Sequence, residues 1–293
     1  MTIDLPPPGA PAWFFHRVGG QRRLGVALPS GELLDVGRDD ELVLLAEGSL
    51  RRDHLLALAE DGEPLAGPPQ LDVPVRRPSK ILCLGKNYAA HAAELGSAVP
   101  EEPFAFAKFQ DTLVPYGAPV VIPHWLDTRV DHEIELALVL GFEDRDGIGR
   151  KDLDPATALE VVAGYTVFND ITARKLQAQD LDKRRPWLRA KSLDTFGPIG
   201  PWVVAADALD AGDLRIQLAV NGQTRQDART SQMVVGIADA LVFLSRHFTL
   251  RPGDIVAMGT PAGIGPLEDG DSMRGEIEKI GVLCNTVRKA TRR

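Results

Sequence analysis

The spacing of apolar and polar residues along the chain predicts many short strands and few helices. Between residues 13 and 36, short β-prone runs are broken by Gly19-Gly20 and by Pro29-Ser30-Gly31, which predicts a small antiparallel meander. A helical segment is expected at about 41–60, and a proline-rich stretch with little periodicity follows it. The sequence therefore predicts a small N-terminal domain over residues 1–72 and a larger domain over residues 73–293.

The second part of the chain carries most of the predicted strands. They are expected at 80–85, 104–109, 118–122, 133–140, 161–169, 255–258 and 276–286. Residues 214–220 alternate in polarity and are followed by Asn221-Gly222, which predicts a hairpin running back through Gln226.

Helical spacing is clear in one place, where apolar residues recur from Ile237 to Phe248 before Arg251-Pro252-Gly253-Asp254 ends the segment. A short helical turn is also expected at 89–95. Since strands and helices do not alternate regularly, the predicted class is α+β, mostly β, with mixed and mainly antiparallel sheets.

Two carboxylates interrupt the apolar run at 133–140. Successive side chains of a strand point to opposite faces, so Glu133 and Glu135 share one face while Ile134 and the later apolar residues pack on the other. Asp131 is a further candidate at the mouth of this site. Two acids near a core repel each other and resist desolvation, and a hard divalent cation would compensate them. This strand predicts half of a metal site.

A third acid, Asp170, stands where the apolar run at 164–169 ends. With Glu133 and Glu135 it would supply three oxygen ligands and leave the other positions of an octahedral ion to water and substrate, which suits Mg²⁺ or Mn²⁺ better than zinc. The alternative reading of the spacing is that the two glutamates lie on a solvated face and Asp170 caps a helix starting at Ile171.

A histidine and a glutamate stand three residues apart in the short helical segment. On a helical turn His91 and Glu94 meet on one face, so the carboxylate can orient the imidazole and stabilise its charged form, as a base that deprotonates water requires. The alternative is an ordinary solvated pair. The other histidines have no matching partners and are expected to be structural.

The glycine-rich segment at 259–265 follows a predicted strand, so its backbone N–H groups could hold an anion. It lacks the Gly-Lys-Ser/Thr of a P-loop and the βαβ context of a dinucleotide site, and a tight turn is the alternative. Lys191 could offer positive charge to a developing oxyanion, or it could join Lys183 and Arg185 in a solvated basic face.

Composition and charge limit the kinds of partner, cellular location and cysteine site that this protein can have. A formal net charge of -8 argues against a nucleic-acid partner. The start of the chain lacks the pattern of a signal peptide, and no apolar run approaches the length of a membrane span, so a cytoplasmic protein without a membrane partner is expected. Cys83 and Cys284 stand far apart, which indicates neither a disulfide framework nor a thiolate zinc site.

Six motifs occur in one order between residues 80 and 287. They are Gly85-Lys86-Asn87-Tyr88 with His91 and Glu94, His132-Glu133-Ile134-Glu135-Leu136, residues 164–177, Lys191-Ser192, Asn221-Gly222, and Gly259-Thr260-Pro261-Ala262-Gly263-Ile264-Gly265. With these motifs the chain resembles the fumarylacetoacetate hydrolase family. The resemblance implies a mixed β-sandwich roll as the catalytic domain, a small β-rich N-terminal domain before it, and a homodimer.

The resemblance also implies roles for single residues. Glu133, Glu135 and Asp170 would hold Mg²⁺ or Mn²⁺, and Lys191 would stand beside the metal. His91 and Glu94 would form the water-activating dyad. The residues expected to contact substrate are Lys86, Asn87, Tyr88, Arg174, Gln177, Gly259 and Thr260.

One position departs from the family pattern. Lys175 stands where the family commonly has an aspartate before its glutamine. The replacement reverses a charge and could alter how a lid or helix is anchored. The three acidic positions keep the family pattern.

The implied function is hydrolysis of a C–C bond in a 2,4-dioxo acid of the acylpyruvate or fumarylpyruvate kind, through a metal-stabilised enolate. His91 would deprotonate the attacking water. Oxaloacetate decarboxylation or tautomerisation, isomerisation of 2-hydroxyhepta-2,4-diene-1,7-dioate, action on a hydroxylated sugar acid, and a non-catalytic protein that keeps the scaffold stay open as alternatives. The small-molecule substrate itself depends on loops around residues 175–190.

Overall fold

The structure is a computed structural model that describes residues 3–7, 9–37 and 40–292. Its strands are β1 (Ala12–Val18), β2 (Gln21–Ala27), β3 (Leu33–Asp35), β4 (Glu63–Pro64), β5 (Gln70–Asp72), β6 (Ile81–Leu84), β7 (Ala105–Lys108), β8 (Leu113–Val114), β9 (Val120–Ile122), β10 (Val130–His132), β11 (Ile134–Leu140), β12 (Val162–Asn169), β13 (Thr172–Ala173), β14 (Gly197–Ala205), β15 (Arg215–Val220), β16 (Gln223–Arg229), β17 (Ile255–Ala257), β18 (Gly265–Pro266), β19 (Ser272–Ile277) and β20 (Gly281–Lys289). Its α-helices are α1 (Glu41–Ala46), α2 (Arg52–Glu60), α3 (Ala89–Glu94), α4 (Arg174–Asp182), α5 (Leu188–Lys191) and α6 (Ile237–His247), and its 3₁₀ helices are η1 (Gln110–Thr112), η2 (Ala158–Val161), η3 (Ala206–Ala208) and η4 (Thr230–Gln232).

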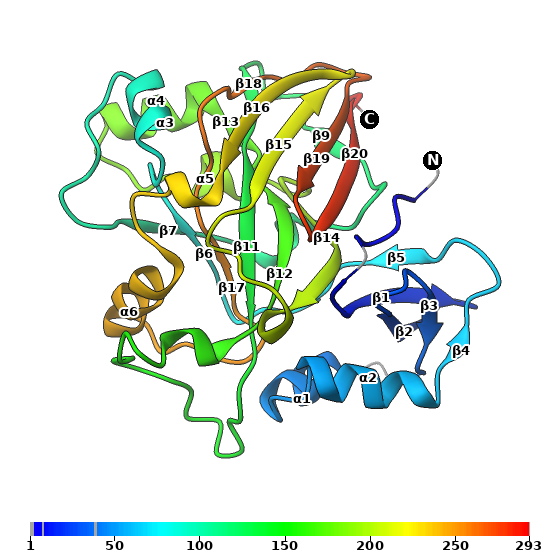
Figure 1. The fold of residues 1–293 in the computed structure, drawn as a ribbon. Coiled ribbons are helices and arrows are strands. Elements are labelled where there is room, and N and C mark those ends of the chain that lie inside the picture. The colour runs from blue at the N-terminus through cyan, green and yellow to red at the C-terminus, as the bar shows by residue number, and fades with distance from the viewer. Residues whose placement is uncertain (1–2, 8, 38–39, 293) are drawn as a thin grey trace.

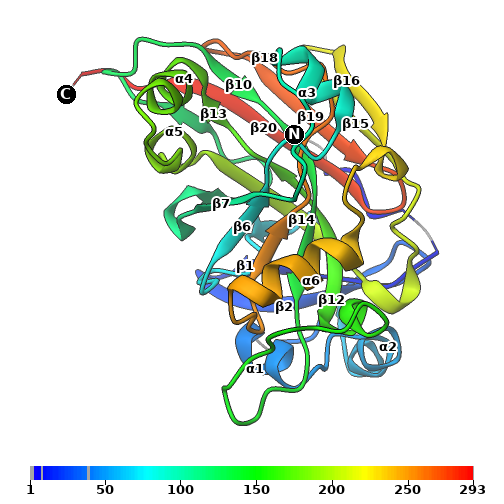
Figure 2. The ribbon, with the colours of Figure 1, turned by 90° about the vertical axis from the view of Figure 1, so that its left-hand side faces the viewer.

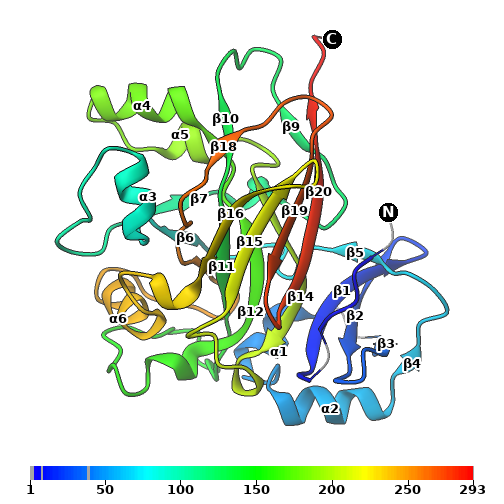
Figure 3. The same ribbon diagram turned by 45° about the horizontal axis from the view of Figure 1, so that its top comes forward.

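The largest sheet runs in the order β4-β3-β2-β1-β14-β12-β11-β17-β6-β7, with β5 paired to β1 and β8 to β14. Its neighbours are antiparallel apart from β17 with β6 and β14 with β8, which are parallel. A five-stranded sheet, β16-β15-β19-β20-β9, lies over β11, β12 and β14 (Figure 3). The predicted mixed and mostly β architecture is confirmed.

The core between these two layers explains the periodicity of β11. Ile134, Leu136 and Leu138 pack in one apolar cluster together with Ile216 and Leu218 of β15. Ala137 and Val139, on the other face of the same strand, belong to a second cluster. The second cluster also contains side chains of the N-terminal strands. Both faces of β11 are therefore buried, as expected for a central strand.

The N-terminal strands extend the largest sheet. β1 pairs with β14, with Ala12 opposite Val204 and Trp13 opposite Val203. α1 and α2 lie against the meander formed by β1, β2 and β3 (Figure 1). The division into domains near residue 72 stays a prediction.

The β15–β16 hairpin forms as predicted. Asn221 and Gly222 have φ of 51° and 77°, which matches a two-residue turn with both central residues left-handed. α3 and α6 also lie where helices are predicted.

Two expectations about single elements are wrong, and one strand was not predicted. The segment predicted as one helix at 41–60 forms α1 and α2, because the chain turns at Gly48, whose φ is +67°. The strand expected at 276–286 is the end of β19 and most of β20, joined by a tight turn. The fully buried strand β14 has no predicted counterpart, since its Pro198 and Pro201 are typical of turns.

The helices that matter for the site gather at one end of the sheets. α3, α4 and α5 lie near β7, β13 and β18 in two views (Figures 1 and 2). Among the described residues, none of the helices has the length and apolar character needed to cross a membrane.

Candidate metal and catalytic site

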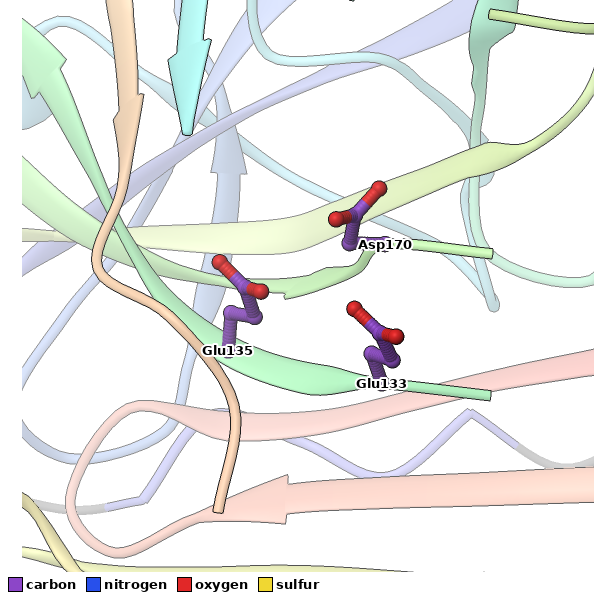
Figure 4. Close-up of side chains that lie close together, drawn as sticks. All are labelled: Glu133, Glu135 and Asp170. Carbon is purple, nitrogen blue, oxygen red and sulfur yellow. The ribbon is translucent and has the colours of Figure 1, made fainter. Parts of the chain in front are cut away.

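Three carboxylates converge where β11 and β12 pair. Glu133 stands between β10 and β11, Glu135 lies on β11, and Asp170 directly follows β12. The backbone N–H of Asp170 donates to the carbonyl of Glu133 at 2.8 Å, which fixes the two chain segments beside each other. One carboxylate oxygen from each residue lies within 4.8 Å of the others (Figure 4). We call Glu133, Glu135 and Asp170 the acidic cluster.

Two buried lysines supply positive charge to the acidic cluster. Lys191 Nζ lies 2.8 Å from Glu133 Oε2 and also contacts Asp170 Oδ2. Lys108 Nζ lies 2.7 Å from Asp170 Oδ1. Burial opposes the charge on Lys191, but Asp170 and Glu133 outweigh it and raise the pKa of Lys191 to about 12. Lys191 is therefore a fixed cation at neutral pH.

The two glutamates of the acidic cluster titrate in opposite directions. Burial opposes ionisation of Glu133, but Lys191 and Arg174 outweigh it and lower its pKa. Burial, then Asp170 and Glu133, raise the pKa of Glu135, whose carboxylate accepts the Gly259 N–H at 2.9 Å. Glu135 has no ion pair with a cationic side chain in the described part of the chain.

The residues of the acidic cluster fit a hard divalent cation. Oxygens bound to one Mg²⁺ at about 2.1 Å lie no more than about 4.2 Å apart, close to the span of the acidic cluster. A cation would compensate the unpaired charge of Glu135, and three carboxylates are a donor set for Mg²⁺ or Mn²⁺ rather than zinc. The hydroxyl of buried Tyr88 also has no hydrogen-bond partner in the part of the chain described. Burial and the charge of Glu135 raise the pKa of this hydroxyl.

The dyad lies on α3, and its two residues are in contact. His91 Nδ1 is 3.1 Å from Glu94 Oε2, and His91 is 5% exposed. The other carboxylate oxygen of Glu94 accepts the Gly263 N–H at 3.0 Å. Glu94 thus fixes the imidazole and ties α3 to the loop at 259–265, which we call the glycine loop.

One small cavity connects most of the predicted residues. It has a volume of about 20 Å³ and is lined by Leu84, Gly85, Lys86, His91, Leu95, Phe106, Glu133, Glu135, Asp170, Arg174, Gln177, Trp187, Lys191 and Thr260. We call it the catalytic cavity. It brings together the acidic cluster, one member of the dyad and four of the residues expected to contact substrate.

Arg174 and Gln177, on the first turn of α4, form one side of this cavity. The Arg174 guanidinium donates to Gln177 Oε1 at 2.6 Å and to Asp131 Oδ2 at 2.8 Å, and it contacts Glu133 Oε1. Asp131 also pairs with Arg129 at 2.5 Å and does not join the acidic cluster. Lys175 is exposed beside them, and no interaction explains the departure from the family pattern.

Three residues expected to contact substrate have their polar atoms in hydrogen bonds within the protein. The Asn87 amide donates to the carbonyls of Val235 and Met258, and its oxygen accepts the Val235 N–H. The Thr260 hydroxyl donates to the Ile134 carbonyl at 2.8 Å. The Gly259 N–H is taken by Glu135, as described above. Asn87 does not line the catalytic cavity.

Sequence reasoning missed Lys108 and Gln226, which come from distant strands. Gln226 is fully buried and connects β16 to both the glycine loop and β11. Its Nε2 donates to Thr260 Oγ1 and to the Pro261 carbonyl, each at 2.8 Å, and its Oε1 accepts the Ile134 N–H at 3.1 Å. The Asn221-Gly222 turn fixes the position of Gln226 on the second strand of the hairpin. This turn was the sequence signal from which Gln226 could have been found.

Comparison with known proteins now decides the family. The model of the fumarylacetoacetate hydrolase C-terminal domain matches residues 80–288. The chain belongs to the fumarylacetoacetate hydrolase family. The predicted resemblance is confirmed, with nearly the same boundaries.

Relatives with curated sequences cover most of the chain. An uncharacterised protein from Pyrococcus horikoshii is 47% identical over 71% of this chain and 87% of its own length. A mitochondrial oxaloacetate tautomerase from Arabidopsis thaliana is 40% identical over 68% of this chain and 86% of its own.

Solved structures extend the likeness to the N-terminal strands. A fumarylacetoacetate hydrolase from Exiguobacterium antarcticum covers 96% of this chain and 100% of its own at a TM-score of 0.83 and 34% identity. A fumarylpyruvate hydrolase from Pseudomonas aeruginosa, in complex with Mn²⁺ and pyruvate, covers 77% of this chain and 94% of its own at a TM-score of 0.67 and 36% identity.

Proposed function

We propose that this protein is a divalent-metal-dependent hydrolase that cleaves the C3–C4 bond of a 2,4-dioxo acid. The observation that carries the proposal is the position of His91, which is oriented by Glu94 and faces the same small cavity as the acidic cluster. The Pseudomonas aeruginosa relative that holds Mn²⁺ and pyruvate supports it.

The acidic cluster would hold Mg²⁺ or Mn²⁺. Such an ion would polarise the 2-oxo group of the substrate and stabilise the negative charge that develops there. Arg174 and Gln177 line the catalytic cavity beside Glu133 and would orient the substrate carboxylate.

His91 would act as the general base. Its Nδ1–H donates to Glu94, which leaves the Nε2 lone pair to take a proton from water. The hydroxide adds to C4, the C3–C4 bond breaks with its electron pair passing to C3, and the His91 imidazolium returns its proton to C3. The new carboxylic acid then releases its proton to solvent. The products are a carboxylate and pyruvate. Glu94 stabilises the imidazolium while it holds the proton.

Lys191 would balance negative charge beside the acidic cluster. Its Nζ lies between Glu133 and Asp170. A catalytic cavity of about 20 Å³ has room for about one water molecule, so competing solvent is kept away.

A second candidate is oxaloacetate keto–enol tautomerisation, which the Arabidopsis thaliana relative favours. It needs a base that moves a proton at C3, and the same His91 would serve. No hydroxide addition and no bond cleavage between carbons are then required.

The deciding experiment compares acetylpyruvate and oxaloacetate with the Mn²⁺-loaded protein. We expect acetylpyruvate to give equimolar acetate and pyruvate, and we expect EDTA to remove the activity and excess Mn²⁺ to restore it. Activity that survives complete metal removal would refute the proposal. Turnover of oxaloacetate alone would replace it with the second candidate. A homodimer and a cytoplasmic location stay predictions.

A further inference from the structure

Aromatic side chains lead away from the acidic cluster in a continuous series. Lys191 Nζ lies 4.8 Å from the centre of the Phe106 ring. The Phe106 ring is 5.5 Å from that of Trp187, and Trp187 packs edge-on against Phe104 at 5.3 Å. The polar part of the site therefore borders directly on an apolar surface made by β7 and the residues just before α5.

A second cavity lies along this surface. It has a volume of about 400 Å³ and is lined by Phe104, Ala105, Phe106, Ala107, Arg185, Pro186, Trp187 and Leu188. We call it the outer cavity. Phe106 and Trp187 are the two residues that line both the outer cavity and the catalytic cavity. These two side chains form an aromatic partition between the cavities.

The volumes indicate that the partition must shift when substrate binds. About 20 Å³ holds a water molecule and is far too small for a dioxo acid. Phe104 is held in place, since its ring fills the space where a side chain on Gly85 would lie. The Phe106 and Trp187 side chains are both half-buried, but Phe106 packs against the second apolar cluster and Trp187 belongs to neither cluster, so Trp187 can move with the smaller loss of core packing.

We propose that the outer cavity receives the acyl group of the substrate, and that the preferred substrates are 2,4-dioxo acids with an apolar acyl chain longer than acetyl. This inference rests on the proposed function. With the oxo acid end at the acidic cluster, the acyl group beyond C4 points toward the aromatic partition. Three aromatic rings, a proline and a leucine offer it apolar surface.

Arg185 is the charged residue of the outer cavity, and it defines the competing possibility. Its side chain could bind a carboxylate at the far end of a dicarboxylic substrate such as fumarylpyruvate. The apolar residues around it outnumber this charge, so we favour the uncharged acyl chain.

The test measures kcat/KM for acetylpyruvate, hexanoylpyruvate and fumarylpyruvate with the Mn²⁺-loaded protein. Complete burial of each methylene should raise kcat/KM about fourfold, so the four additional methylenes of hexanoylpyruvate should raise it at least about tenfold over acetylpyruvate even when they are only partly buried. Calorimetric Kd values for pyruvate and 2-oxooctanoate give a readout that does not depend on turnover. The longer acid should bind at least about tenfold more tightly.

Leu188→Asp places a charge in the outer cavity without touching the catalytic cavity, and it should remove the preference for hexanoylpyruvate. Leu181→Asp is the matched control, because Leu181 is 52% exposed on α4 and lines neither cavity. Trp187→Ala should reduce the same preference, and Trp125→Ala, at a 58% exposed position, is its control.

The outcomes separate this inference from the proposed function. Cleavage of acetylpyruvate with equal kcat/KM for all acyl lengths would overturn the inference and leave the proposed function intact. A preference for fumarylpyruvate that disappears in Arg185→Gln would overturn it in favour of a dicarboxylic substrate. Failure to cleave any dioxo acid refutes the proposed hydrolase, and equal Kd values for pyruvate and 2-oxooctanoate then refute the apolar cavity as well.

Discussion

Gln226 accepts a hydrogen bond from His132, with 3.0 Å between Oε1 and Nδ1, and both residues are fully buried. The Ile134 N–H donates to the same oxygen, which fixes the orientation of the Gln226 amide. Because this oxygen accepts, the proton of His132 lies on Nδ1. Burial lowers the pKa of His132, so the ring is neutral. The peptide between Glu133 and Glu135 is thereby fastened to the glycine loop.

We predict that Gln226→Glu weakens Mn²⁺ binding and lowers kcat by about tenfold or more, because it keeps the accepting oxygen but loses the two bonds donated to Thr260 and Pro261. The free energy of unfolding should also fall by about 1–3 kcal/mol. Gln223→Glu, exposed on the same strand, is the control. Calorimetric Mn²⁺ binding and kcat values check this, and equal effects of the two variants would contradict it.

His91→Ala should lower kcat by about a hundredfold to ten-thousandfold, because the imidazole is assigned to proton transfer. The Kd for Mn²⁺ should stay nearly unchanged, since His91 is not a member of the acidic cluster. His124→Ala, at an exposed histidine, serves as the comparison. A Kd for Mn²⁺ that rises in step with the fall in kcat would make His91 a ligand and not a base.

His16 provides a pH test of the N-terminal strands. Burial lowers its pKa, with Asp35 opposing, so the folded protein binds its proton less readily than the unfolded chain does, whose histidine pKa is about 6.5. The free energy of unfolding therefore keeps its full value, as far as His16 is concerned, above this pKa of the unfolded chain. It decreases as the pH falls below that pKa, by at most about 1.4 kcal/mol per pH unit.

Urea unfolding of wild type and His16→Gln between pH 7.5 and 5 measures how the free energy of unfolding of each protein changes with pH. We expect the stability of wild type relative to the variant to decrease toward low pH. His54→Gln removes an exposed histidine on α2 and should leave the pH dependence of wild type unchanged. A difference between wild type and His16→Gln that does not vary with pH would refute the assignment.

The sequence predicted the parts of the site that local patterns encode. Alternation along one strand placed Glu133 and Glu135 on a common face, and helical spacing joined His91 to Glu94. The end of a second apolar run placed Asp170. These features depend on neighbours within a few residues, so periodicity alone could reveal them.

The sequence could not predict contacts between distant segments. Lys108 reaches Asp170 from β7, and Gln226 reaches Thr260 from β16, without a local signal that joins either pair. The pairing of β1 with β14 was missed because β14 contains two prolines. Asn87 and Thr260 carry family motifs, yet only the folded chain reveals that their polar atoms are used internally.

Glu135→Gln should change stability in opposite directions with and without metal. Without metal, burial and the neighbouring Asp170 and Glu133 oppose ionisation of Glu135, which has no ion pair in the described part of the chain. The neutral side chain of the variant avoids this cost, so the free energy of unfolding should rise by on the order of 1 kcal/mol. At a Mn²⁺ concentration of about 100 times its Kd, wild type should gain about 2.7 kcal/mol and the variant almost nothing.

Thermal unfolding in EDTA and in saturating Mn²⁺ therefore should reverse the order of the two melting temperatures. Glu101→Gln, at an exposed position, should follow wild type under both conditions. A variant that gains as much from Mn²⁺ as wild type does would exclude Glu135 from the metal site. A variant that is less stable than wild type in EDTA would mean that the carboxylate of Glu135 is already compensated in the metal-free protein.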